Sequence, residues 1–231
     1  MLPIPAAPDT RVIFVRHGNV HNPENIIYGR LPRMGLSTRG REDMERTASH
    51  LAAVPLAAIY TSPLLRARQS AGYVSRRHPD VPLRTCSWLI EVQTSWEGES
   101  NKATSQIRGF SYYDPPKGEG DETIMDVFGR MDRAMRMVVR RHPGQTSVCV
   151  SHGDPIKILR IGYSGKELTP QNVRAPDPGQ ASMLLFHFWH PEALPIISAA
   201  DLGQLEHIIA GDHLRETPPV PAPPSPQVTT S

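Results

Sequence analysis

"VIFVRHGNVHNPENIIYGR", residues 12–30, is the stretch that decides the fold. It opens with four apolar residues, 12–15, a short run typical of a strand buried on both faces. The run ends abruptly in Arg16, His17 and Gly18. A buried strand that ends in a cation, an imidazole and a glycine allows two interpretations. Either these are ordinary loop residues, or the histidine is reactive and faces an anionic group.

A later stretch, "SVCVSHGD" at residues 147–154, repeats the pattern of a buried strand that ends in histidine and glycine. Here the pair is His152 and Gly153, directly after Ser151. Glycine at such a place lets the backbone approach a ligand closely. A single histidine is usually an ordinary surface or core residue, but two buried strands with the same ending favour a shared functional role.

Strand and helix signals alternate along the chain. We expect strands or extended segments within 12–15, 56–63, 81–91, 145–154 and 182–189. We expect helices within 38–53, 64–77, 121–141 and 155–165. This alternation predicts an α/β protein, a three-layer α/β/α sandwich around a largely parallel sheet. Ligands of such sheets bind just beyond the carboxyl ends of the strands.

Two of the expected helices carry recognisable local signals. Ser37 is a typical N-cap for the helix that follows it. The helix expected within 121–141 has an apolar stripe at helical spacing, which we interpret as core, formed by Met125, Phe128, Met131, Met135 and Val138.

The ends of the chain differ from its middle in composition. Residues 1–9 and 215–231 are rich in proline, so we expect a flexible N-terminus and a disordered tail. Residues 10–214 form the expected domain. Within it, 98–121 lacks a clear helical period and is expected to form a small cap, in which Tyr112 and Tyr113 pack rather than stack on a ligand.

Composition narrows the class of protein. The chain has 231 residues and a formal net charge of +2, which is too small to indicate nucleic-acid binding. Its two cysteines have no zinc-binding spacing and suit a reducing compartment. No secretory segment follows Met1, and no apolar stretch has the length of a membrane span. We therefore expect a cytoplasmic protein without a membrane or nucleic-acid partner.

The residues at the strand ends predict one pocket. Arg16 and His17 end the first strand, Arg66 lies shortly after the second, Glu91 ends the third extended segment and His152 follows the fourth. Phosphoryl transfer through a phosphohistidine needs such a set. A neutral imidazole attacks phosphorus, arginines hold the phosphoryl oxygens, and a carboxylic acid protonates the leaving oxygen. This chemistry requires neither a metal nor a cofactor.

Five segments of the chain, in order, resemble the histidine phosphatase superfamily, also called phosphoglycerate-mutase-like. They extend over roughly residues 11–188 and are "RHG" at 16–18, "YGRLPRMGLSTRG" at 28–40, "TSPLLRARQSA" at 61–71, "WLIEVQTSWEGES" at 88–100 and "VSHGD" at 150–154. The family's first motif alone is a weak signal, whereas five ordered segments are a strong one.

The resemblance implies a role for each matching position. His17 is the phosphorylated nucleophile, and Glu91 is the proton donor that later acts as the base. The phosphate pocket is formed by three catalytic side chains, Arg16, Arg66 and His152. Gly18 and Gly153 support it by keeping the backbone close to the phosphate.

Three departures from the family pattern leave alternatives open. Asn19 and a valine follow the first motif, where the family has an acidic residue or glutamine and then threonine. The position of the family's pocket asparagine holds Pro23, so Asn22 or Asn19 is a candidate for that phosphate-binding role. The gap from Glu91 to the following "WEG" is one residue short, which keeps Glu97 as a second candidate acid.

The segment after Glu91, "EVQTSWEG", resembles phosphatases of the family more than its mutases. The prediction is therefore a metal-independent, acid-type histidine phosphatase that hydrolyses a small phosphate monoester. The alternatives are a phosphoglycerate-type phosphomutase and a non-catalytic protein that binds a phosphorylated ligand. The sequence leaves the oligomeric state open, with a dimer among the options.

Overall fold

The computed structural model describes residues 4–107, 113, 118–173, 179–190 and 193–200. The strands are β1 Thr10–Arg16, β2 Leu56–Thr61, β3 Leu83–Thr85, β4 Thr146–Ser151, β5 Met183–Phe188 and β6 Ile196–Ala199. The helices are α1 Thr38–Leu51, α2 Leu65–Arg77, the 3₁₀ turn Ser87–Leu89, α3 Asn101–Ser105, α4 Ile124–Arg141, α5 Gly153–Tyr163 and α6 Pro170–Val173. The tail expected at 215–231 lies outside the described residues.

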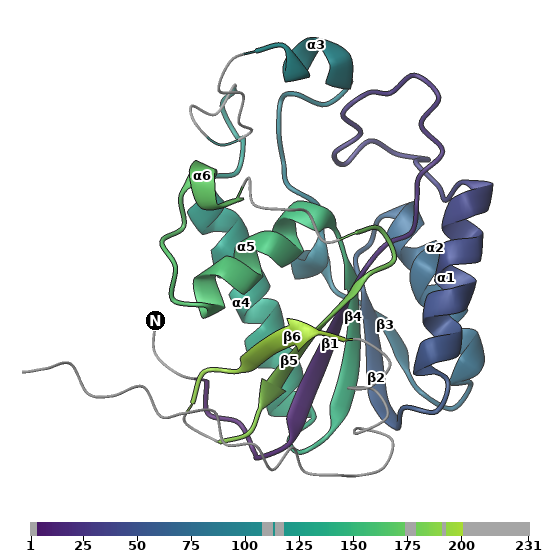
Figure 1. Cartoon of the computed structure of the whole chain (residues 1–231), viewed down its shortest axis with the longest axis vertical. Helices are drawn as coiled ribbons and strands as arrows, with labels where there is room; N and C mark the ends of the chain where they lie inside the picture. The colour runs from purple at the N-terminus through teal and green to yellow at the C-terminus, as the bar shows by residue number, and fades with distance from the viewer. Residues whose placement is uncertain (1–3, 108–112, 114–117, 174–178, 191–192, 201–231) are drawn as a thin grey trace, which may run out of the picture.

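The six strands form one sheet in the order β3-β2-β4-β1-β5-β6. The first four strands in this order are parallel, whereas β5 and β6 each run antiparallel to their neighbour. Figure 1 shows that the helices flank this sheet. The predicted α/β class with a largely parallel sheet is therefore confirmed.

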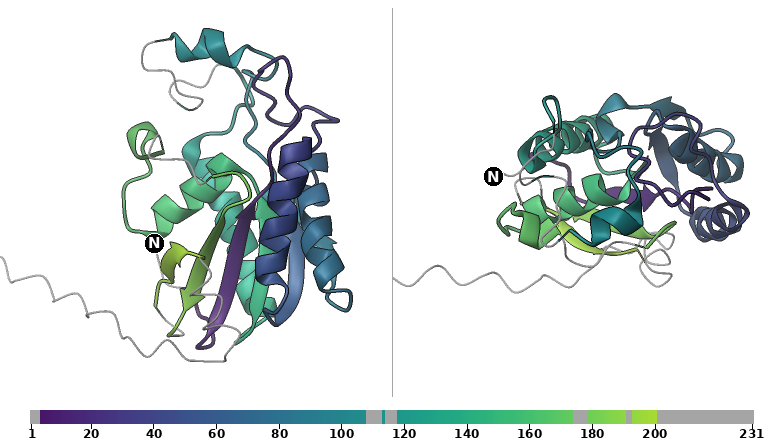
Figure 2. Two further views of the ribbon diagram at one scale, coloured as in Figure 1. Left: turned by 45° about the vertical axis from the view of Figure 1, so that its right-hand side comes forward. Right: turned by 90° about the horizontal axis from the view of Figure 1, so that it is seen from above.

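Helices cover both faces of the sheet. In Figures 1 and 2, α1 and α2 lie against one face, and α4 and α5 lie against the other. Two separate cores result. One packs Met44 and Leu51 of α1 onto Ile13 of β1, and the other packs Met131 of α4 onto Phe14 of the same strand. β1 alternates its side chains between these cores, which explains its continuous apolar sequence.

Side chains cap the first turn of two helices, and the sequence predicted one of these caps. The side chain of Ser37 accepts a hydrogen bond from the backbone N–H of Gly40 and caps α1 as expected. Thr123 and Asp126 form a reciprocal capping box at the start of α4. The stripe assigned to α4 was partly wrong, because Met125 is 60% exposed, while Ile124 on the preceding position is buried.

Other elements were not anticipated. The segment 81–91, expected to be extended, forms only the short strand β3 and then a 3₁₀ turn. β6 and α3 had no sequence signal that we used. Near the N-terminus, where we expected a flexible segment, Ile4 and Ala6 are buried in the α4-side core. The apolar surface that these two side chains bury is the physical reason why the segment lies against the domain.

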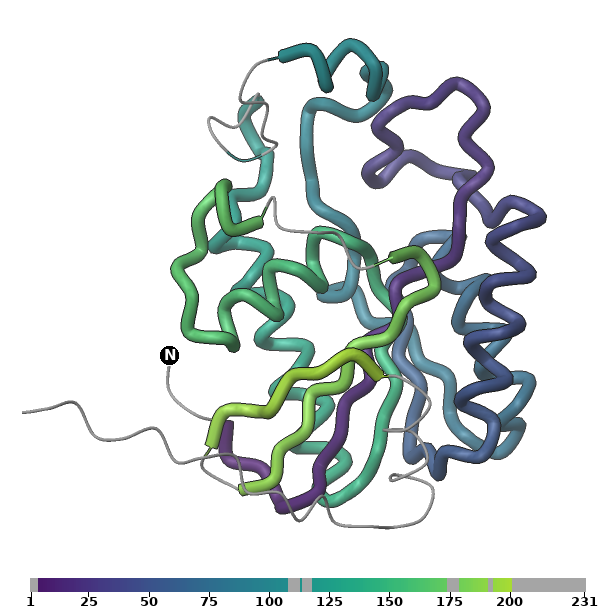
Figure 3. The backbone as a smooth tube through the Cα atoms, viewed as in Figure 1, coloured from purple at the N-terminus to yellow at the C-terminus, as the bar shows by residue number. Residues whose placement is uncertain are grey.

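The end of the sheet that carries the strand carboxyl termini lies under irregular chain. The tube in Figure 3 shows the segment between β1 and α1 and the segment around α3 rising together above this end. The isolated β-bridge between Ile26 and Ser100 joins these segments, together with hydrogen bonds such as that from Ile27 N–H to the carbonyl of Glu99, 2.8 Å. None of the described helices has the length and apolarity to cross a lipid bilayer.

Candidate active site

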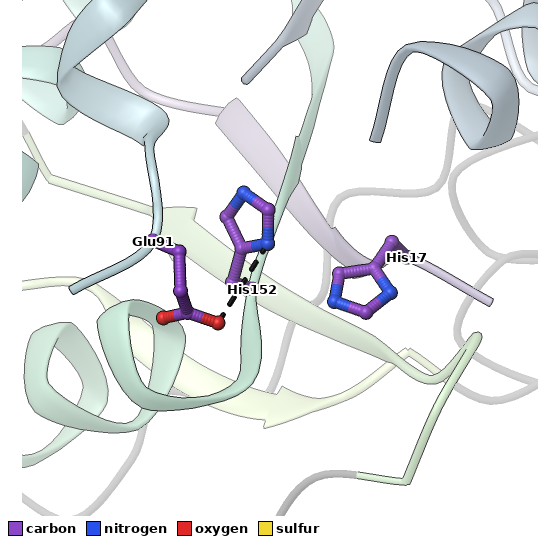
Figure 4. A group of neighbouring side chains, drawn as sticks. All are labelled: His17, Glu91 and His152. Carbon is purple, nitrogen blue, oxygen red and sulfur yellow. Dashed lines mark ion pairs between the residues drawn. The ribbon is translucent and has the colours of Figure 1, made fainter. Parts of the chain in front are cut away.

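The register of the two central strands places His17 beside His152. Arg16 of β1 pairs with Ser151 of β4, so the next residue of each strand leaves the sheet at the same level. The two imidazole centroids lie 5.0 Å apart with the rings nearly edge to face. Both histidines are buried, with at most 1% exposure. Figure 4 shows the two rings with the carboxylate of Glu91 beside them.

The hydrogen bonds of His17 define its tautomer. Its Nδ1 lies 2.8 Å from the carbonyl oxygen of Gly18, which can only accept, so Nδ1 carries the proton. Nε2 therefore bears the lone pair, and Nε of Arg66 donates to it at 3.3 Å. Burial and the charge of Arg66 hold the pKa of His17 well below its usual range. His17 is thus a neutral imidazole with a nucleophilic nitrogen.

His152 is fixed by the strand next to β4. Its Nε2 lies 2.7 Å from the hydroxyl of Ser62, the residue that follows β2. Its Nδ1 lies 3.7 Å from Oε2 of Glu91 and has no hydrogen-bond partner among the described residues. Burial, together with the charge of Arg66, holds the pKa of His152 well below its usual range. The neutral ring therefore keeps a polar atom available for a ligand.

Arg66 is a fully buried cation beside the two histidines. It lies in the first turn of α2, directly after β2, and is 0% exposed. One terminal nitrogen, Nη2, donates to the carbonyl of Gly29 at 2.7 Å and lies 3.9 Å from Oε2 of Glu91. The other, Nη1, has no hydrogen-bond partner among the residues that the structure describes. The ring of Tyr28 covers the guanidinium, with its centroid 4.8 Å from Cζ.

Two glycines allow the site to be assembled this closely. A side chain at Gly153 would place its Cβ 3.0 Å from Cζ of Arg16, so glycine makes room for that guanidinium. A Cβ at Gly18 would lie 2.4 Å from the carbonyl oxygen of Gly40, so glycine also lets α1 approach the end of β1. The N–H of Gly18 donates to the hydroxyl of Ser70 on α2.

Glu91 faces the histidines from the segment after the 3₁₀ turn. Its side chain is 16% exposed, and Oε1 accepts a hydrogen bond from the N–H of Val92. Burial raises the pKa of Glu91 to about 7, although the charge of Arg66 opposes this rise and that of Asp154 adds to it. Glu91 can therefore give up or take up a proton near neutral pH.

Side chains from two other segments hold the backbone that carries Glu91. Its carbonyl oxygen accepts from Nε of Arg30 at 2.8 Å and from Nη2 of Arg130 at 3.2 Å. Both arginines form ion pairs with Glu122, at 2.9 and 2.8 Å. Glu122 also accepts from the N–H of Gln93. This network joins the loop after β1, the start of α4 and the Glu91 segment into one unit.

The raised pKa of Glu91 predicts a pH-dependent cost to stability. Between pH about 4.5 and 7 the folded protein binds more protons than the unfolded chain, so the free energy of unfolding falls as the pH rises. The substitution Glu91→Gln resembles the protonated acid. We expect it to be nearly neutral at pH 4.5 and stabilising by on the order of 1–3 kcal/mol at pH 8.

Urea unfolding of both proteins at several pH values measures this difference. Glu45→Gln on the exposed surface of α1 is the control, because Glu45 pairs there with Arg77 in solvent. An equal effect of Glu91→Gln at pH 4.5 and pH 8 would contradict the prediction.

A cavity of about 250 Å³ opens above these groups. Its lining residues are Arg16, Ile26, Ile27, Tyr28, Gly29, Glu91, Val92, Thr94, Asn101, Gly153 and Asp154. His17, Arg66 and His152 are not among them and are at most 1% exposed. Residues of the loop after β1 therefore form part of the wall above the two histidines.

Three candidate residues from the sequence make hydrogen bonds to other groups and do not line the cavity. The amide of Asn19 donates to Gln180 and accepts from Ser37, and neither Asn19 nor Asn22 lines the cavity. The amide of Asn22 closes a local turn with the backbone of Ile26. Glu97 accepts from the backbone N–H of Arg30 and is not a lining residue. The structure therefore brings Glu91, rather than Glu97, next to the histidines.

Sequence reasoning missed several residues that contact the site. Ser62 and Ser70 were within a quoted motif, but nothing in their type indicated their partners. Tyr28 and Arg30 lie in the quoted segment 28–40 and Arg130 lies on α4, all far in the sequence from the residues that they contact, so only the fold reveals their contacts with Arg66 and Glu91. Tyr113 is buried, as expected, and its hydroxyl donates to Asp154. Tyr112 lies outside the described residues.

The donor set also has to be considered as a metal site. Ligand atoms of His17, Glu91 and His152 lie within 4.8 Å of one another, which is close enough to hold an ion. However, the lone pair of His17 already receives a hydrogen bond from the guanidinium of Arg66. A buried cation at this position repels a metal ion and attracts an anion. The arrangement fits a phosphate better than it fits a metal.

Comparison with known proteins gives a consistent result. The histidine phosphatase superfamily (branch 1) matches residues 12–193. An uncharacterized protein of Mycobacterium tuberculosis, Rv0525, is 36% identical over 165 residues, which cover 69% of this chain and 81% of that protein. Phosphoserine phosphatase 1 of Hydrogenobacter thermophilus is 28% identical over 168 residues, which cover 69% and 78%.

A solved structure shares the architecture. YhfR of Bacillus stearothermophilus superposes with a TM-score of 0.72 at 27% sequence identity, covering 86% of this chain and 99% of that one.

Proposed function

The chain belongs to the histidine phosphatase superfamily, and from this we propose that it hydrolyses a small phosphate monoester through a phosphohistidine on His17. One observation carries the proposal. A neutral imidazole with its lone pair on Nε2 lies beside a buried guanidinium, and a nitrogen of that guanidinium, Nη1 of Arg66, has no hydrogen-bond partner among the described residues. Buried donors without partners are rare and favour an anion as the missing acceptor.

In the first half of the proposed reaction, Nε2 of His17 attacks phosphorus. The bond from phosphorus to the ester oxygen breaks as the new bond to nitrogen forms. Arg16, Arg66 and His152 hold the equatorial oxygens, where charge is spread in the transition state. Protonated Glu91 gives its proton to the departing oxygen, and the alcohol leaves neutral.

In the second half, water attacks the phosphohistidine. Glu91, now a carboxylate, takes a proton from this water while the water oxygen bonds to phosphorus and the bond to Nε2 breaks. Inorganic phosphate leaves, and His17 and Glu91 return to their starting protonation states. A pKa near 7 suits Glu91 to both steps, because it must be an acid in one and a base in the other.

The name of one relative, phosphoserine phosphatase 1, supports hydrolysis. Another relative, from Arabidopsis thaliana, is called phosphoglycerate mutase-like protein 4 and keeps a mutase as the second candidate. A mutase would transfer the phosphoryl group back to its substrate instead of to water. The proposed partner is therefore a small phosphorylated metabolite.

A phosphate-release assay tests the function directly. Purified protein treated with EDTA is given a panel of phosphorylated metabolites and p-nitrophenyl phosphate, and released phosphate is measured. We expect release that is insensitive to the chelator. Loss of release with EDTA and its return with a divalent metal would contradict the metal-independent mechanism. Transfer of phosphate between phosphoglycerates without release would instead support the mutase.

A further inference from the structure

The charges of the side chains that line the cavity indicate which alcohols could occupy it as the leaving group of the substrate. This inference rests on the proposed function and goes further, to the charge of the leaving group. Among the lining residues that the structure describes, Arg16 alone has a cationic side chain. Its guanidinium lies against Gly153, beside the end of β4, where it is assigned to the phosphate.

The remaining wall is apolar, neutral or acidic. Ile26, Ile27 and Val92 provide apolar surface, whereas Thr94 and Asn101 provide neutral polar groups. The acidic member besides Glu91 is Asp154, in the first turn of α5. Among the described lining residues, a leaving group in this cavity therefore meets the carboxylate of Asp154 and no cation other than Arg16.

Asp154 is held firmly at this wall. Its Oδ2 accepts a hydrogen bond from the hydroxyl of Tyr113 at 2.8 Å, and its Oδ1 pairs with Nζ of Lys157 at 2.9 Å. Its side chain keeps 22% exposure. Each carboxylate oxygen can accept more than one hydrogen bond, so Asp154 retains acceptor capacity for a substrate hydroxyl or ammonium group.

Three cations of the described chain that are near the cavity do not line it, and two of them are paired with carboxylates. Lys157 pairs with Asp154 and does not line the cavity. Arg30 is bound by Glu122 and by the carbonyl of Glu91. Lys102 follows the lining residue Asn101 on α3 but is exposed and is not a lining residue itself. A carboxylate on the leaving group would thus be desolvated beside Asp154, and none of the described lining residues except Arg16 could serve as its counterion, which is unfavourable.

We propose that the substrate is the phosphate monoester of a neutral or cationic alcohol, such as a polyol or an amino alcohol, and that Asp154 determines this specificity. Esters of hydroxy acids are disfavoured substrates. Asp154 favours the first class of substrate because it accepts hydrogen bonds from hydroxyl or ammonium groups. It disfavours the second class because its charge repels a carboxylate.

Two matched substrate pairs test the proposal. In the first pair, O-phosphoserine has a carboxylate that O-phosphoethanolamine lacks. In the second pair, 3-phosphoglycerate has a carboxylate where sn-glycerol 3-phosphate has a hydroxymethyl group. We expect kcat/KM to be higher for the member without the carboxylate by about tenfold or more in at least one pair. Because each ratio is taken within one enzyme preparation, it is insensitive to the fraction of folded protein.

The substitution Asp154→Asn removes the charge and keeps the shape. We expect it to lower both ratios by about fivefold or more. Asp132→Asn is the matched control, because Asp132 also accepts from a tyrosine hydroxyl, that of Tyr163, and pairs with a cation, Arg136, but does not line the cavity. Its ratios should equal those of the wild type.

The outcomes separate this inference from the function on which it rests. Hydrolysis of p-nitrophenyl phosphate together with a preference for the carboxylate-bearing members would overturn the inference alone. Ratios that do not change in Asp154→Asn would overturn the role of Asp154. If no ester is hydrolysed, p-nitrophenyl phosphate included, the proposed function fails and this inference fails with it.

Discussion

Replacement of His17 by alanine is expected to abolish phosphate release, with a loss of roughly 10⁴-fold or more in kcat. The substitution removes the nitrogen that forms the bond to phosphorus, and we expect that Nδ1 of His152, which faces Glu91 at 3.7 Å, does not replace it. The remaining imidazole, His152, has its Nε2 engaged by Ser62. Steady-state release of phosphate from p-nitrophenyl phosphate measures the effect.

A second buried histidine provides the control for this experiment. His78 follows the far end of α2, and its ring lies 3.0 Å from the carbonyl of Leu51. His78→Ala should alter stability while leaving kcat within about threefold. Residual activity of His17→Ala above roughly one hundredth of wild type would rule out His17 as the nucleophile.

Replacement of Glu91 by glutamine is expected to affect substrates according to their leaving groups. An alkyl alkoxide is a strong base and needs a proton as it departs, so we expect hydrolysis of alkyl phosphates to fall by about 10²–10⁴-fold. The p-nitrophenolate ion leaves without protonation, so its phosphate should lose far less in the first step. Burst and steady-state kinetics with both kinds of ester measure the two effects.

The same substitution should change the pH profile. The acid form of Glu91 predominates below its pKa of about 7, so hydrolysis of alkyl phosphates should decline as the pH rises above 7. In Glu91→Gln this decline should disappear, because the group that titrates has been removed. Glu97→Gln is the matched control, and an equal leaving-group effect in that variant would move the acid to Glu97.

Much of the fold could be predicted because local signals agreed with the tertiary structure. The apolar runs 12–15 of β1 and 148–150 of β4 reflect burial on both faces, and the cap at Ser37 fixes where α1 begins. The segment 81–91 was harder, because its turn at 87–89 depends on contacts of its backbone. Nη1 of Arg130 on α4 binds the carbonyls of Trp88 and Ile90, and no local pattern records this.

The site was predictable to a similar extent. The strand ends identified His17, Arg66, Glu91 and His152, and the structure brings these four side chains together. The contacts that orient them were not predictable, since they depend on strand register and on loops that meet above the sheet. Asn19 illustrates the limit, because its amide is bound by Gln180, 161 positions away in the sequence.

The hydrogen bond between Arg66 and the carbonyl of Gly29 has a consequence for product release. Nη2 carries two N–H groups, so it can hold the Gly29 carbonyl with one while the unpartnered Nη1 donates to a phosphate oxygen. In the proposed reaction, the hydrogen bond to the carbonyl would therefore remain when inorganic phosphate departs. The guanidinium would keep its orientation between turnovers, so that binding the next phosphate costs little ordering of this side chain.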